Sequence, residues 1–91
     1  MTRRTRTRIL IDILEALSKR PGQPATRLAT ATNMAYDRLA AILEKLEERG
    51  IVEKTRDGNR AGYALTDRGK QLLRELKRLE KILRDFGIET I

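Results

Sequence analysis

Two short amphipathic segments, separated by only three or four residues, constrain the fold of this chain more than any other feature. The first, over residues 25–31, offers Leu28 and Ala29 as one apolar patch. The second, over residues 35–49, carries apolar residues at three- and four-residue spacing and is closed by Gly50. Two helices joined by so short a turn predict a helix-turn-helix, whose second helix can enter a DNA groove.

The flanking segments extend this pattern on both sides. An earlier stripe of Ile and Leu predicts a helix over residues 9–20, ended by a Pro-Gly pair. Two β-type segments, 51–55 and 63–65, enclose the turn dipeptide Asp57-Gly58, and Thr66 is placed to cap a last helix that reaches about Phe86. This order predicts a mainly α (α+β) fold: a winged helix-turn-helix with a two-stranded wing and a long C-terminal coiled-coil helix.

Composition excludes most enzyme chemistries. The 91 residues include 20 Lys or Arg against 13 Asp or Glu, a net charge of +7, and contain neither His nor Cys. The chain therefore lacks a thiol nucleophile, an imidazole base, a disulfide frame and an ordinary zinc or haem site, and no phosphate loop or catalytic carboxylate pair appears. We expect one domain that is not an enzyme and needs no cofactor or metal.

The first eight residues concentrate positive charge, with four Arg and no acid. No apolar run approaches the roughly 20 residues of a membrane span, so we expect a soluble cytoplasmic protein without a membrane partner. We divide the chain into a basic arm (1–8), a winged-helix domain (9–66), a dimerisation helix (67–86) and a tail (87–91). The arm would bind DNA phosphates by counterion release, the alternative being a solubility tail; its arginines are Arg3, Arg4, Arg6 and Arg8.

Two short motifs suggest a family. The turn Asn33-Met34-Ala35-Tyr36 and the junction Tyr63-Ala64-Leu65-Thr66-Asp67-Arg68-Gly69 resemble those of the small archaeal winged-helix coiled-coil DNA-binding proteins, and the likeness covers about residues 8–86. The resemblance implies a dimer held by the last helix that binds duplex DNA in chromatin organisation or transcriptional control. Ala35 stands where these proteins place Ser, so we expect Asn33 or Thr32 to cap the following helix.

The helix over 35–49 supplies the candidate recognition residues. At about 100° per residue, Asp37, Ala41, Glu44 and Glu48 point most directly outward when the apolar stripe faces inward. We expect the acids Glu44, Glu47 and Glu48 to face away from DNA. Contacts to bases or phosphates are assigned to Tyr36 and Arg38, and backbone contacts to Lys45.

Further cations surround the wing and the preceding helix. Lys54, Arg56 and Arg60 flank the flexible tip, which suits minor-groove or phosphate contact; the alternative is a charged edge that prevents strand pairing between molecules. Thr26 and Arg27 begin the helix over 25–31, where a phosphate can lie near the helix N-terminus.

The last helix separates apolar from basic residues. A heptad seam of Leu72, Leu76, Leu79, Leu83 and Phe86 is longer than the first helix can cover, so we expect it to pair with a second copy, in parallel or antiparallel orientation. Opposite the seam the helix carries a basic face, interpreted as a solvated coiled-coil surface or a DNA-facing stripe; its residues are Lys70, Arg74, Lys77, Arg78, Lys81 and Arg84.

These features predict a homodimeric, nucleoid-associated protein that binds double-stranded DNA as a chromatin organiser or a transcriptional regulator. RNA remains an alternative partner. A rival class is a winged-helix module for protein interaction that uses the coiled coil or the acidic patch of Glu44, Glu47 and Glu48.

Overall fold

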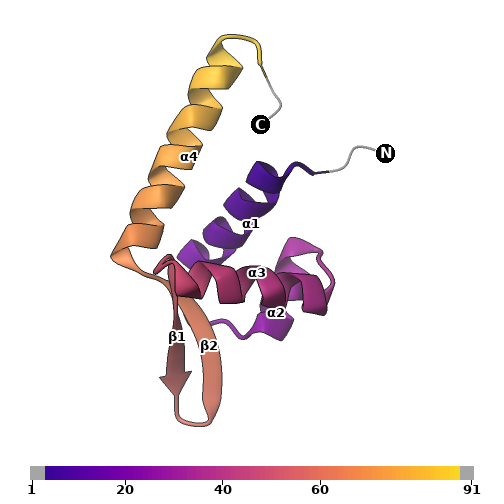
Figure 1. Cartoon of the computed structure of the whole chain (residues 1–91), viewed down its shortest axis with the longest axis vertical. Coiled ribbons are helices and arrows are strands. Elements are labelled where there is room, and N and C mark those ends of the chain that lie inside the picture. Colours follow the sequence, from indigo (N-terminus) through magenta and orange to yellow (C-terminus); the bar gives the residue numbers. More distant parts are fainter. Residues whose placement is uncertain (1–3, 89–91) are drawn as a thin grey trace.

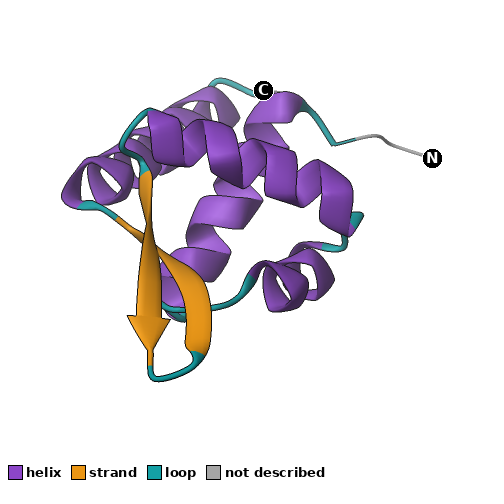
Figure 2. Ribbon diagram, turned by 60° about the horizontal axis from the view of Figure 1, so that its bottom comes forward, coloured by secondary structure: helices purple, strands orange, loops and turns teal. Residues whose placement is uncertain are grey.

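The computed structural model describes residues 4–88 and shows a cluster of three helices, a β-hairpin and a long fourth helix (Figure 1). The predicted winged helix-turn-helix is confirmed. Figure 2 shows the hairpin projecting from the helical cluster. The elements in chain order are α1 (Arg6–Lys19), α2 (Ala25–Thr32), α3 (Tyr36–Glu48), β1 (Val52–Asp57), β2 (Arg60–Leu65) and α4 (Asp67–Asp85).

Helix α1 is the centre of the core. Its side chains at Ile11, Ile13, Leu14 and Leu17 are completely buried, because α2, α4 and β2 all pack against this one helix. The predicted patch on α2 and stripe on α3 close the core from the other side, with Leu28, Leu39 and Leu43 fully buried. Removing one such Leu side chain costs about 2–5 kcal/mol of stability.

The first helix begins earlier than the sequence pattern predicts. Thr5 is its N-cap, and the Thr5 hydroxyl accepts a hydrogen bond from the Arg8 backbone N–H at 3.0 Å. The predicted arm of residues 1–8 therefore extends too far, because Arg6 and Arg8 belong to α1. Arg3 lies outside the described residues.

The turn between α2 and α3 depends on Asn33. This residue ends α2 in the left-handed conformation, with φ of 55°, which Asn tolerates better than most residues. The Thr32 hydroxyl donates to the Leu28 carbonyl oxygen at 2.7 Å. The prediction that Asn33 or Thr32 caps α3 is wrong: the N-cap is Ala35, and no side chain in the described part of the chain caps this helix.

The wing is a two-stranded antiparallel hairpin that is attached to the chain segment before α2. Its register pairs Val52 with Leu65 at the base and Asp57 with Arg60 at the tip. The Tyr63 N–H donates to the Gln23 carbonyl oxygen at 2.9 Å, and the Gly22 N–H donates to the Tyr63 carbonyl oxygen at 2.8 Å. The buried Gln23 amide in turn donates to the Ala16 carbonyl oxygen at 2.9 Å, so the wing base and the end of α1 are held together.

The last helix begins against the base of the wing. The Thr66 hydroxyl accepts from the Gly69 N–H at 3.0 Å and lies 2.6 Å from the Gly50 carbonyl oxygen, which confirms the predicted cap and joins it to the end of α3. From there α4 rises beside α1 and away from the wing (Figure 1).

Candidate nucleic-acid interface

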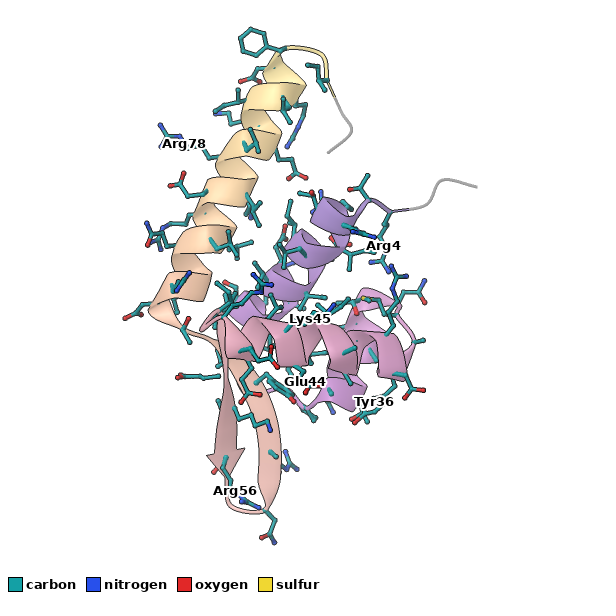
Figure 3. The ribbon with its side chains drawn as sticks, viewed as in Figure 1. Arg4, Tyr36, Glu44, Lys45, Arg56 and Arg78 are labelled. Atoms are coloured by element: carbon teal, nitrogen blue, oxygen red, sulfur yellow. The ribbon has the colours of Figure 1, made fainter. Side chains whose placement is uncertain are left out.

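The predicted recognition residues lie on the surface of α3. Tyr36 is 51% exposed, and Arg38 and Lys45 are also exposed. Tyr36 projects from the side of α3 on which the wing lies, and Arg56 lies at the wing tip (Figure 3). The start of α3 and the tip of the wing are therefore presented on the same side of the molecule.

An acidic residue shares this side of α3. Glu44 is exposed and projects toward the wing side of the helix (Figure 3). That it faces away from DNA stays a prediction. Glu47 lies 3.8 Å from the Lys54 ammonium on β1, an ion pair between α3 and the wing. Within residues 4–88, Glu44 has no ion-pair partner. Its carboxylate can accept from a cytosine amino group, whereas it repels phosphate.

The wing presents two arginines beside its turn. Arg56 and Arg60 are exposed and flank the positive-φ residue Gly58, which allows the tight reversal. Their long side chains suit contact with phosphates, because such contacts need no fixed register.

Thr26 and Arg27 are exposed on the first turn of α2. They lie along an open groove between α1 and α2 whose other walls carry both acids and bases, including Asp12, Glu15 and Lys19. The α2 segment carries no acid of its own, so Arg27 gives this turn a net positive charge.

Arg4 and Arg8 are engaged within the chain. Arg4 Nη1 lies 2.9 Å from Asp12 Oδ2, and Arg4 Nη2 donates to the Asn33 carbonyl oxygen at 3.3 Å. Arg8 forms ion pairs with Asp12 at 3.2 Å, with Glu15 at 3.7 Å and with Glu80 on α4. These two arginines therefore join elements of the fold, and Arg6 is the exposed cation at the start of α1.

The heptad seam of α4 is divided between two environments. Leu72 and Leu76 are partly buried against the core of the same chain, together with the fully packed Leu73. Leu83 is half-buried, whereas Leu79 is 44% and Phe86 79% exposed. The seam prediction missed Ile82, which is 44% exposed, because it falls off a strict heptad, and Ile88, which is 49% exposed and lies beyond the end of α4. The exposed apolar surface of α4 lies only on its C-terminal half.

The described residues hold no group of acidic residues arranged to bind a metal ion. In the same part of the chain, no helix is long and apolar enough to cross a membrane.

The fold and the exposed helix-wing surface define a winged helix-turn-helix protein. The chain belongs to this family, whose model matches residues 3–84. The family is non-enzymatic, which confirms the prediction made from composition.

Solved structures of MarR-type transcription regulators are similar to this chain. A MarR family transcription regulator, SP03579, has a TM-score of 0.78 at 26% identity. The similarity covers 87% of this chain and 54% of the regulator's chain. The repressor CouR bound to a 23-mer DNA duplex has a TM-score of 0.73 at 29% identity, with coverages of 87% and 56%. PcaV from Streptomyces coelicolor, with its natural ligand, has a TM-score of 0.68 at 25% identity, with coverages of 84% and 60%.

The chain thus spans little more than half the length of these regulators. A search of curated proteins gave no match.

Proposed function

We propose that this chain is a homodimeric protein that binds double-stranded DNA, with α3 in the major groove and the wing on phosphates. The observation that carries the proposal is the common side presented by Tyr36 and the tip arginine Arg56 (Figure 3). CouR, which is 29% identical, is bound to a DNA duplex in its solved structure.

The dimer of this proposal forms through the C-terminal half of α4. Leu79, Ile82 and Phe86 expose apolar surface there, whereas Leu72 and Leu76 pack against the core of the same chain. A second copy of the same helix removes this surface from water and provides a self-complementary interface.

Between the two DNA-binding roles, the likeness to MarR-type regulators favours a transcriptional regulator. Two observations favour a nucleoid-associated chromatin organiser in the cytoplasm. One is the resemblance to small archaeal winged-helix coiled-coil proteins, and the other is that many cations lie on the wing and on α4, where they suit contact with phosphates and not with bases. Genome-wide occupancy separates the two roles: a few sharp sites indicate a regulator, and broad coverage indicates a chromatin organiser.

The test is titration of the purified protein with a random duplex of about 30 base pairs, followed by fluorescence anisotropy at increasing salt. We expect binding that weakens with salt at a log-log slope of about 0.9 per phosphate neutralised. Competition with duplex RNA of the same length tests RNA as the alternative partner. No binding to random duplex, or to duplexes selected from a random library, contradicts the proposal.

Variants divide the roles of α3 and the wing. Arg56→Ala with Arg60→Ala should weaken binding equally on all sequences and reduce the salt slope by about 2, whereas Arg38→Ala should also reduce sequence preference. Lys19→Ala with Arg49→Ala removes two exposed cations outside the proposed interface and is the matched control. Equal loss of preference from the wing and α3 variants contradicts this division.

A second candidate is a protein-interaction module, which the acidic surface of α3 favours. From Tyr36 to Glu48 this helix carries four acids against two bases, and Glu44 is directed to the wing side. A pulldown partner that survives nuclease and high salt, and is lost in Glu44→Lys, supports this candidate.

A further inference from the structure

Helix α4 carries a larger net positive charge than the helix-turn-helix and wing elements α2, α3, β1 and β2. The elements α2, α3, β1 and β2 together carry six Lys or Arg and six Asp or Glu, a net charge of zero. Helix α4 alone carries seven Lys or Arg against four Asp or Glu, a net charge of +3. The surface of α3 and the wing, which is proposed to bind DNA, therefore contributes little to the long-range electrostatic attraction of DNA.

The cations of α4 form one continuous face. At about 100° per residue they fall within a sector of about 120°, opposite Leu76 and Leu79. Of the four acids of α4, Asp67 and Asp85 lie at its ends. Glu80 is on the flank next to Arg8 of α1, and Glu75 is outside the sector on the other flank, about 60° from Arg78. All six members are exposed: Lys70, Arg74, Lys77, Arg78, Lys81 and Arg84.

Nearly all of these charges are unneutralised by the protein. In the part of the chain that the structure describes, only Arg84 forms an ion pair, at 3.9 Å to Glu80. Six cations held within about 21 Å along one helix repel one another, so binding an anion of matching length relieves that repulsion.

The basic face runs along the side of α4, from the flank of the buried Leu73 to the side turned away from α1. Arg78 projects to the side of α4 opposite α1 (Figure 3). The longest dimension of the molecule is 47 Å, with the wing tip and the C-terminal end of α4 at opposite ends (Figure 1). A duplex seated on α3 and the wing therefore lies at one end of the molecule, and the outer turns of α4 are directed away from it.

We propose that the basic face of α4 binds the phosphate backbone of a second DNA duplex. This inference rests on the proposed function, since it treats the winged surface as the first DNA site. The face carries cations without aromatic or amide side chains for reading bases, which suits sequence-independent contact and counterion release. Pairing centred on Leu79 and Phe86 leaves most of the basic face open, because these two residues lie about 80–100° from the nearest cation, Arg78. Ile82 borders the face, about 40° from Arg78.

The experiment measures capture of one duplex by another through the full-length protein. A biotinylated duplex is immobilised and saturated with protein, and a fluorescent duplex of unrelated sequence is then added at low salt. The test variant is Arg74→Gln, Lys77→Gln and Lys81→Gln, in which Gln keeps the helix propensity of the exposed positions. The control removes the same charge from scattered exposed cations: Lys19→Gln, Arg49→Gln and Arg68→Gln.

We expect the wild type and the control to capture the second duplex. The α4 variant should lose capture by about tenfold or more, with the salt slope of capture reduced by about 2.7, or 0.9 for each of three lost contacts. Its affinity for a single duplex, measured by anisotropy, should stay within about threefold of that of the control.

Three other results would each contradict the inference. Capture by the α4 variant at the level of the control overturns the inference, because the two winged surfaces of a dimer would then hold both duplexes. Binding of the first duplex without capture of the second overturns the inference alone. Failure of the wild type to bind the first duplex overturns the proposed function and the inference together.

Discussion

Two glycines determine how closely separate parts of the backbone approach one another. A Cβ atom at Gly69 would lie 2.1 Å from the Ile51 carbonyl oxygen, and one at Gly62 would lie 2.1 Å from the Gly22 carbonyl oxygen. Both contacts involve backbone atoms, which cannot move aside as a flexible side chain can. The first sets α4 against the end of α3, and the second sets the wing against the segment before α2.

Gly69→Ala should therefore lower the free energy of unfolding by about 1–3 kcal/mol or more, because α4 must shift to accommodate the added methyl group. Gln71→Ala, on an exposed position of the same helix, should change it by no more than about 0.5 kcal/mol. Urea unfolding of both variants provides the measurement. Equal stability of the two variants would show that the start of α4 can move freely.

Ala35 leaves α3 without a side-chain cap, although its backbone has the extended geometry of an N-cap, with φ of −63° and ψ of 138°. Ala35→Ser should raise the free energy of unfolding by about 0.5–2 kcal/mol, since the hydroxyl can accept from a free N–H of the first turn. Ala41→Ser, on the exposed middle of α3, should lower it slightly. Thermal unfolding by circular dichroism compares them, and a destabilised Ala35→Ser would show that the N-cap geometry excludes a serine hydroxyl.

At the scale of elements, the sequence predicts the order and type of every helix and strand. The stripes on α1, α2 and α3 repeat at helical spacing, and the Asp57-Gly58 turn identifies the hairpin, so local patterns suffice. The failures are long-range. A heptad seam does not show that Leu72 and Leu76 are covered by α1, and a basic N-terminal run does not show that Arg8 meets Glu80, 72 residues away.

Helix α4 packs on the core at one end and, in the proposed dimer, pairs with a second copy at the other; apolar substitutions should separate these two roles. Leu79→Ser with Ile82→Ser removes exposed apolar surface, so it should raise the dimer dissociation constant by about tenfold or more without unfolding the monomer. Leu73→Ala should instead lower the free energy of unfolding by about 2–5 kcal/mol, because this side chain is buried in the core. Sedimentation and urea unfolding together make the test, and loss of folding in the exposed double variant would contradict the assignment.

Arg8 should matter for the packing of α1 on α4 rather than for DNA. Replacing Arg8 with Gln, Glu80 with Gln, and both together forms a double-mutant cycle, in which we expect a coupling of about 0.5–1 kcal/mol, as for partly exposed charge networks. Arg6→Gln is the matched control, since Arg6 is exposed on the same turn. If Arg8→Gln lost much more DNA affinity than Arg6→Gln, Arg8 would instead be assigned to the DNA interface, as the sequence predicts.

At the scale of the whole molecule, the proposed dimer links folding and pairing through one helix. The core turns of α4 carry Leu73, and the outer turns carry Leu79, Ile82 and Phe86. Dimerisation stabilises the folded state by mass action, so the melting temperature should rise with protein concentration. The Leu79→Ser and Ile82→Ser variant should melt at a temperature independent of concentration; scanning calorimetry over a hundredfold range compares the two proteins. A wild-type melting temperature that does not change with concentration would contradict dimerisation through α4.

The attachment of the wing to the segment before α2 leaves the length of the hairpin free to vary among proteins of this fold. Gly62 and Tyr63 hold the middle of the hairpin against Gly22 and Gln23, whereas a Cβ atom added at Gly58 would meet no described atom within 4 Å. Insertions beside Gly58 would lengthen the hairpin and leave every core contact in place. Evolution, or an engineer, can therefore vary how far the hairpin extends along a ligand while keeping the stability of the domain unchanged.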